Sequence, residues 1–373
     1  MKKILLPLVL FVTALSVLAN DGSFYSSGNT LIPLQETRIG LKKEVLRFYV
    51  RDFSYMDVEV DFEFFNPDRA RRLTVGFVTP PAIGDVSQEE ESHPQITGFT
   101  VEVNGRTIPF QIKRMKDTSF KLGDSEVRGD DFVYYFPADF KKGSNRIRHT
   151  YRFRGGTSVE MQRDFNYQIT TGKRWANSQI DDFRLEVHLD NGIYFIPASF
   201  VKSGKAAPWQ IEGDGVIDQN QSFWFDEESP KIRMAHLNRG YLLLEEKNFR
   251  PDNDFFVGEY NWPAGWASRW CRGDEDECIE PEMAEKILPY FDLKPWDGVD
   301  QNDLAELSET ELKLVRNFFY AVRGLDFKDA ELRKFYSRFF WYKPDKTLKA
   351  EEVRFSDAEK IFLDKVREAE KKK

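Results

Sequence analysis

Side chains that could do chemistry are few in this sequence, and none falls into a catalytic motif. His149 and His188 lie in segments that alternate as strands do, where a satisfied structural histidine is the usual explanation. The HExxH, GxSxG, P-loop and GxGxxG patterns, which position zinc ligands, a serine nucleophile or phosphates, do not occur. We therefore predict no catalytic residues, no metal site and no cofactor.

The two cysteines, Cys271 and Cys278, bracket an acidic loop. In an oxidising compartment, two neighbouring cysteines most simply form a disulfide, which we predict here. Residues 271–302 hold ten Asp or Glu against three Lys or Arg, so calcium-dependent adhesion is one alternative function. The EF-hand spacing of calcium ligands is absent.

Trp262, Trp266 and Trp270 stand four residues apart just before this loop. Exposed aromatic rings at such a spacing could bind a sugar, so these residues are candidate ligand-binding positions. The simpler interpretation is that they pack the joint against its neighbours. Pro263 and Gly265 argue against one regular helix through the segment.

The N-terminal stretch has the features of a secretory signal peptide. Lys2 and Lys3 precede an apolar run from residue 4 to 17, and Val17 and Ala19 are the small residues that signal peptidase requires. We expect cleavage after Ala19 and no transmembrane segment in the product. The protein is then exported, and either the periplasm or the exterior is its final location.

The composition indicates a folded protein of several domains. Its 373 residues exceed one typical domain, and 41% hydrophobic residues suffice for packed cores. A net charge of −8 argues against nucleic-acid binding. The predicted units are a signal peptide (1–19), a β-sandwich domain (20–160), a second β domain (161–260), an acidic Trp-rich joint (261–302) and a helical domain (303–373).

From residue 20 to about 260, apolar and polar residues alternate with a period of two, which predicts antiparallel strands. Val58, Val60, Phe62 and Phe64 define one buried face, and Asn104-Gly105 predicts a hairpin turn. Basic residues occupy four of the five even positions of 146–154, namely Arg146, Arg148, Arg152 and Arg154, and Thr150 is the fifth. We predict that they lie across from the acidic row at 57–63 on a neighbouring strand, because opposite charges stabilise a ladder. The alternative is an anion-binding strip.

This β region loosely resembles a family of exported bacterial proteins defined by a domain of unknown function, number forty-four twenty-four. The matching features are Asn20-Asp21, a strand–Asn66–strand unit that closes at Pro80, the TTG-x-x-W block from Thr170 to Trp175, and an FRLEV strand. The resemblance implies a pair of β-sandwiches and no assigned activity.

From residue 303 the apolar period becomes helical. Ser308-x-x-Glu311 and Ser356-x-x-Glu359 are capping boxes, and Gly324 suits a helix C-terminus. The predicted inward faces are Leu312, Val315, Phe319 and Val322 in the first helix, Leu332, Phe335, Tyr336 and Phe339 in the second, and Ala358, Phe362, Val366 and Ala369 in the third. Three such helices predict a small bundle.

The order and spacing of residues in this module resemble those of a YARHG domain. The signature residues are Arg316, Asn317, Tyr320, Ala321, Arg323, Gly324, Trp341 and Tyr342. Val322 and Arg323 stand where the family name has Arg and His. The resemblance implies an extracellular module with no established molecular function. Helical spacing places Arg316, Tyr320 and Arg323 on one face, where we expect them to fasten the helix to its neighbours.

The leading hypothesis is an exported, non-enzymatic bacterial envelope protein, mainly β with a small helical module. Its expected role is to bind an envelope protein or glycan or to organise the envelope. The alternative is a hydrolase of envelope glycan or peptide, because distant carboxylates can converge in space. Its carboxylates would come from the junction of the β domains or from the loop at 271–285.

Overall fold

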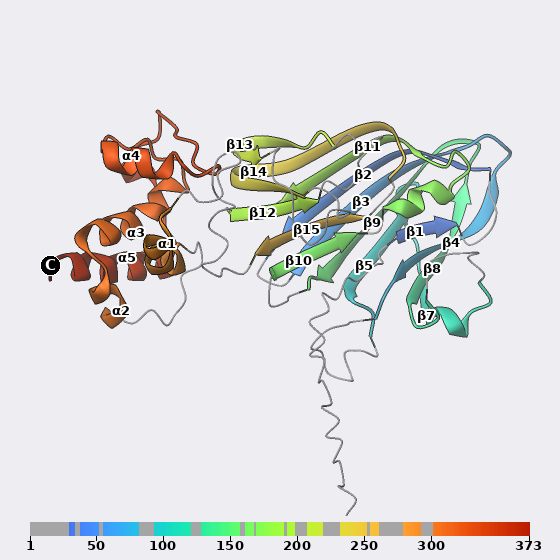
Figure 1. Ribbon diagram of the computed structural model, residues 1–373. Coiled ribbons are helices and arrows are strands. Elements are labelled where there is room, and N and C mark those ends of the chain that lie inside the picture. Colours follow the sequence, from blue (N-terminus) through green and yellow to red (C-terminus); the bar gives the residue numbers. More distant parts are fainter. Residues whose placement is uncertain are drawn as a thin grey trace, which may run out of the picture.

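The computed structural model describes residues 30–33, 38–51, 55–81, 93–120, 128–156, 161–167, 169–189, 192–197, 207–218, 232–251, 254–260, 279–291 and 301–373. Within them, a β region precedes a helical region along the chain (Figure 1). The predicted signal peptide, the tryptophan row and both cysteines lie outside the described residues. Among the described helices, none is long and apolar enough to cross a membrane.

One large sheet contains most of the strands. Its neighbouring strands are, in spatial order, β10 (Met161–Tyr167), β15 (Phe255–Tyr260), β12 (Gly192–Pro197), β14 (Ile232–Phe249), β11 (Ile180–His188), β2 (Gly40–Val50), β3 (Tyr55–Asn66), β9 (Gly143–Arg154), β5 (Ile96–Val103) and β6 (Arg106–Thr107), and β13 (Gln210–Asp218) also pairs with β14. Within this sheet, all described strand pairings are antiparallel except that of β2 with β11.

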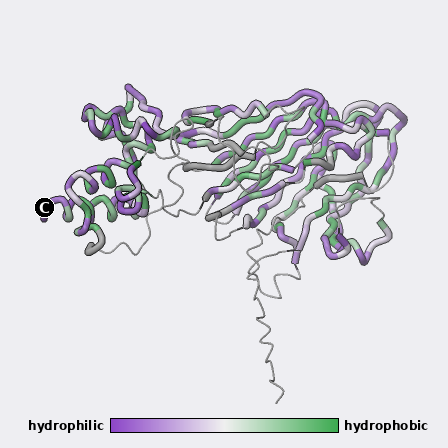
Figure 2. The backbone as a smooth tube through the Cα atoms, in the orientation of Figure 1, coloured by the Kyte–Doolittle hydropathy of each residue, from purple (hydrophilic) through white to green (hydrophobic). Residues whose placement is uncertain are grey.

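A smaller sheet packs on part of the large one. Its order is β1 (Thr30–Pro33), β4 (Arg71–Thr79), β8 (Phe132–Phe140) and β7 (Gln111–Arg114). Side chains of both sheets form one hydrophobic core, in which the rings of Phe77 on β4 and His149 on β9 lie 5.1 Å apart. The mainly β fold predicted for the N-terminal part is confirmed, and alternating hydropathy along the strands is visible in Figure 2.

The parallel pairing of β2 with β11 joins the two halves of the β region. It runs from Asp182 opposite Lys43 to His188 opposite Tyr49. The same hydrophobic core extends from Ile39 to Val257. The expected division between residues 160 and 161 therefore falls inside one continuous sheet.

Local predictions along the strands are confirmed. Val58, Val60, Phe62 and Phe64 are buried, and Asn104 and Gly105 have φ of 51° and 77°, as a tight hairpin turn requires. The strand that follows this turn is short, since β6 has two residues. The next strand, β7, pairs with β8 in the smaller sheet.

The basic and acidic rows are cross-strand neighbours, as predicted. Asp57 pairs with Arg152, Asp61 with Arg148 and Glu63 with Arg146 along β3 and β9. Arg152 Nε lies 2.8 Å from Asp57 Oδ1, and Arg146 also forms an ion pair with Asp61. Because these guanidinium groups have carboxylate partners, the row is a charge ladder and not an anion-binding strip.

Reversing one charge of this ladder should destabilise the sheet. Replacing Arg152 by Asp places two carboxylates face to face, and we expect a loss of about 1–2 kcal/mol in the free energy of unfolding. Combining it with Asp57→Arg restores the opposite charges and should recover most of that loss in urea denaturation. Equal stabilities of the single and double variants would contradict the pairing.

The helical region has its own hydrophobic core. Its helices are α1 (Pro281–Ile287), α2 (Gln301–Glu306), α3 (Glu309–Ala321), α4 (Ala330–Tyr336) and α5 (Asp357–Glu370). Short 3-10 turns occur at Met115–Asp117, Thr170–Arg174, Leu288–Tyr290 and Ala350–Glu352. Both predicted capping boxes are present, at the starts of α3 and α5. The small helical domain predicted at the C-terminal end is confirmed.

Two details of this region differ from the sequence-based expectation. The helical core begins before residue 303, because Ile287 and Leu288 from the expected joint are buried in it. In the sequence, the many acidic residues of the joint made it look like a polar loop, so the short helix α1 was not expected there. Ala358, predicted to face inward, is exposed, and its neighbour Glu359 is buried instead.

Candidate functional site

The signature side chains of α3 form ion pairs with α5. Arg323 donates from Nη2 to both carboxylate oxygens of Glu359, at 2.7 and 2.9 Å, and from Nη1 to the carbonyl oxygen of Phe319 at 2.9 Å. The Glu359 side chain is 2% exposed, and that of Arg323 is 19% exposed. Glu359 also accepts from the backbone N–H of Ser356, as the capping box requires. The Glu359 carboxylate therefore links α3 to α5 and also caps the N-terminus of α5.

A second ion pair lies further along the same two helices. Arg316 Nη1 is 3.0 Å from Glu370 Oε2, and both side chains are partly exposed. Asn317 donates to the carbonyl oxygen of Lys313, four residues earlier in α3, at 2.7 Å. Ala321 is fully buried. Most of these polar contacts therefore stay within the helical region.

Tyr320 and Arg323 both contact Phe355, the residue before the N-cap of α5. The rings of Tyr320 and Phe355 meet edge to face at 4.9 Å, and the Arg323 guanidinium lies 5.2 Å from the Phe355 ring centre. Such contacts add to the ion pairs that hold α3 against α5. The structure thus places Arg316, Tyr320 and Arg323 against the third predicted helix.

Gly324 ends α3 in a Schellman motif. Leu325 N donates to Tyr320 O at 3.0 Å, and Gly324 N donates to Ala321 O at 2.9 Å. The φ of Gly324 is 82°, a left-handed conformation that glycine adopts without steric cost.

Trp341 and Tyr342 are both fully buried. Tyr342 donates from its hydroxyl to Leu325 O at 2.9 Å, and Trp341 stacks on Phe339 at 5.0 Å. The pair therefore anchors the chain after α4 beneath the end of α3. Its rings face the interior and leave no platform for a ligand at this position.

The hydrolase hypothesis needs a general acid among the carboxylates of the β region. Glu186 on the outer face of the large sheet lies 2.7 Å from Arg184, 3.4 Å from Arg47 and 3.3 Å from His188. Burial alone would raise the pKa of Glu186, but these hydrogen bonds and charges outweigh it and lower the pKa. A general acid needs the opposite shift.

Glu44 has a raised pKa but lies in the core. It is 3% exposed, and burial raises its pKa to about 8, against a small lowering by a hydrogen bond from Tyr167. The hydroxyl of Tyr167 donates to Glu44 Oε1 at 3.5 Å. A substrate could reach neither atom without opening the sandwich. Among the described residues, no three His, Cys, Asp or Glu side chains gather as metal ligands.

His149 differs from the satisfied structural histidine that its strand suggested. It is fully buried, and neither ring nitrogen has a hydrogen-bond partner. Phe62, Phe77 and Phe99 surround it, with ring centres 5.1–5.7 Å away. Burial lowers the pKa of His149 to about 3, although Asp61 opposes the shift. This ring is an apolar packing group at neutral pH.

Comparison with known families decides what the helical module is. Residues 295–371 match the YARHG domain family. The C-terminal module is a YARHG domain. The match begins before the predicted boundary at residue 303, and the helical core begins earlier still, at Ile279. No curated protein matches the sequence.

Solved structures resemble the whole chain only distantly. A proposed nutrient-binding protein from Legionella pneumophila has 18% identity and a TM-score of 0.47, with 92% of this chain and 98% of that chain covered. An M1 zinc metallopeptidase from Deinococcus radiodurans has 12% identity and a TM-score of 0.27, covering 68% and 54% of the two chains. Yeast LTA4 hydrolase has 9% identity and a TM-score of 0.29, covering 70% and 37%. None of these likenesses is strong enough to assign an activity.

The residue that sequence reasoning missed in the YARHG domain is Glu359. Its capping-box position was recognised, but its partner across the bundle was not. A signal was available, because the buried stripe Phe362, Val366 and Ala369 extends back to residues 358 and 359. Helical spacing from Phe362 permits either neighbour, so only the position of Arg323 decides between them.

Proposed function

We propose that this protein is an exported bacterial envelope protein that binds peptidoglycan or another envelope glycan and does not turn it over. The match of residues 295–371 to the YARHG family is the observation that carries this proposal, because the YARHG domain is a candidate peptidoglycan-binding module of exported proteins. The ion pairs of Glu186 and the burial of Glu44 argue against these two carboxylates as general acids of a hydrolase.

Cosedimentation with purified peptidoglycan sacculi tests both parts of the proposal. The mature protein should pellet with the sacculi, and the supernatant should contain no released glycan or peptide fragments. Deleting residues 279–373 removes the helical core and should abolish pelleting, with circular dichroism showing that the β region remains folded. The exposed substitution Lys360→Ala serves as a folded control and should pellet normally.

Two outcomes would overturn the proposal in different ways. Release of soluble fragments by the purified protein shows an enzyme. Equal pelleting of the full chain and the deletion variant places binding outside the YARHG domain.

A further inference from the structure

The β13–β14 hairpin carries polar groups that are hydrogen-bonded to one another within the hairpin. Gly213 and Gly240 pair in the ladder, with φ of 135° and 96°, and an irregularity in register follows at Asp214 and Gly215. Asn238 on β14 donates to Asp214 Oδ2 at 3.1 Å. This hydrogen bond orients the Asp214 carboxylate, so that its other oxygen, Oδ1, has a defined position.

Lys343 of the YARHG domain binds Asp214 and Gly215 of the hairpin. Its ammonium group lies 3.0 Å from Asp214 Oδ1 and 3.3 Å from the carbonyl oxygen of Gly215. Hydrogen bonds from Thr347 lower the pKa of Asp345 most, and the positive charge of Arg239 on the hairpin lowers it further. The two surfaces are complementary in charge where Lys343 meets Asp214.

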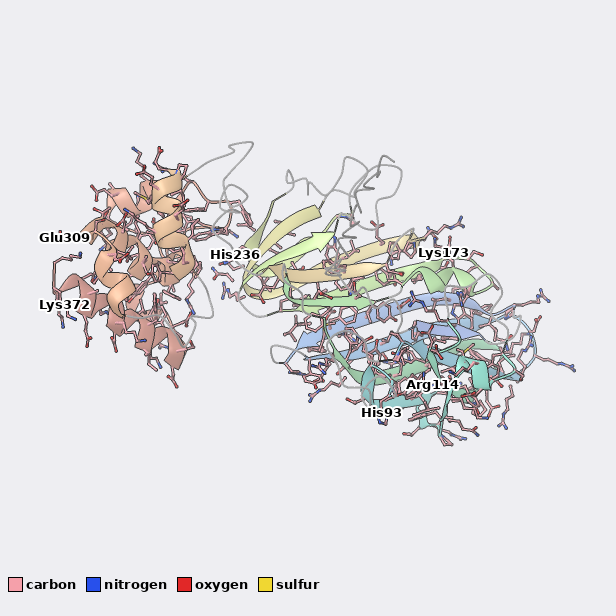
Figure 3. The ribbon with its side chains drawn as sticks, turned by 60° about the horizontal axis from the view of Figure 1, so that its bottom comes forward. His93, Arg114, Lys173, His236, Glu309 and Lys372 are labelled. Atoms are coloured by element: carbon pink, nitrogen blue, oxygen red, sulfur yellow. The ribbon has the colours of Figure 1, made fainter. Side chains whose placement is uncertain are left out.

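Buried groups lie beside these charges. The rings of His236 on β14 and Trp341 lie 6.0 Å apart at 62°, and both residues are buried. Val216 on β13 packs on the helical core. Figure 3 places His236 at the end of the sheet that faces the helices. Exposed ion pairs alone contribute little, so this apolar contact is the larger part of the attraction.

The signature glycine lies at the same contact. A Cβ on Gly324 would be 2.8 Å from Lys343 O and 3.2 Å from Asn238 Nδ2. Asp345 N also donates to Gly324 O at 2.7 Å. Glycine is required here for its φ and for this close approach, so one signature position shapes both the helix end and the surface that meets the hairpin.

We infer that the face of the YARHG domain around Gly324, Trp341 and Lys343 is a docking surface for a β-hairpin, and that β13–β14 of the same chain is its occupant. This contact fixes the YARHG domain on the β region independently of the segment that connects them. The inference goes beyond envelope binding, because a surface occupied by the hairpin leaves any glycan to bind on another face of the domain.

A nicked chain tests the inference. A protease site is inserted between residues 266 and 267, the folded full-length protein is cleaved, and the association of the two halves is measured by size-exclusion chromatography across a dilution series. The halves should co-elute after cleavage. Lys343→Glu puts like charges at Asp214 and should weaken association by at least about tenfold, and Asp214→Lys in the same chain should restore it. Lys360→Glu makes the same charge change on α5 and should have no effect.

If the two halves of the parent protein separate after cleavage, the inferred docking surface is wrong. It is also wrong if the Lys343→Glu variant associates as tightly as the parent. Circular dichroism of each uncleaved variant checks folding, and rescue by Asp214→Lys separates lost docking from lost structure, because an unfolded domain cannot be rescued by a distant charge.

Discussion

Replacing Arg323 by Ala should lower the free energy of unfolding of the YARHG domain by about 3–5 kcal/mol. The reason is the 2% exposure of Glu359, whose carboxylate would lose both short hydrogen bonds from the guanidinium and remain buried. A buried charge without its partner costs far more than an exposed pair contributes. Thermal or urea denaturation followed by circular dichroism at the helical signal measures the change.

Arg367→Ala is the matched control for this substitution. It makes the same side-chain change on α5, where the pair with Asp364 is exposed, and should cost no more than about 0.5 kcal/mol. Adding Glu359→Gln to Arg323→Ala removes the stranded charge and keeps a capping-box side chain, so the double variant should be more stable than the single one. A single variant as stable as Arg367→Ala would show that the pair contributes nothing to folding.

The second large effect concerns pH and the buried Glu44. Burial raises its pKa in the folded protein to about 8, whereas its ordinary value is 4.5. Between these values the folded state holds a proton that the unfolded state releases. Stability contributed by this group is therefore complete below about pH 4.5, falls as pH rises, and levels off above about pH 8, with a slope of at most about 1.4 kcal/mol per pH unit.

Glu44→Gln isolates this contribution, because glutamine carries no charge at any of these pH values. The stability difference between Glu44→Gln and the parent should shift in favour of the variant by several kcal/mol between pH 5 and pH 8. His149 and His236 have lowered pKa values from burial and affect the pH profile too, but they are common to both proteins and cancel in the difference. Urea denaturation at each pH gives the measurement.

Glu63→Gln provides the control on the neighbouring strand β3, at an exposed position of the opposite face. The free energy of unfolding of Glu63→Gln should stay within about 0.5 kcal/mol of the parent's at each pH. If the Glu44→Gln difference is equally constant from pH 5 to pH 8, Glu44 is ionised in the folded protein and water reaches it. The core described for the sandwich would then be incorrect at this point.

Local structure followed directly from the order of residues. The strand at 55–66, the turn at Asn104-Gly105, the capping boxes and the helix end at Gly324 each depend on neighbours a few positions apart, so periodicity and side-chain type suffice to predict them. The pairing of the row at 57–63 with the row at 146–154 was also accessible, because complementary charges identified the partner strand.

Long-range partnerships were decided only by the tertiary structure. The parallel pairing of β2 with β11 merges two predicted domains into one sheet, and nothing in either strand specifies the other. The partner of Arg323 is Glu359 and not another acid of α5, because the crossing of two helices selects which residue comes within hydrogen-bond distance. The docking of Lys343 on Asp214 joins residues on different elements, which no local pattern could reveal.

The sequence by itself therefore determined many of the strands and the main helices of the C-terminal region and identified the YARHG domain, because those depend on local spacing. The tertiary structure determined that most signature residues hold the domain together or face the hairpin. That distinction depends on which groups are buried against one another, and burial is a property of the folded chain.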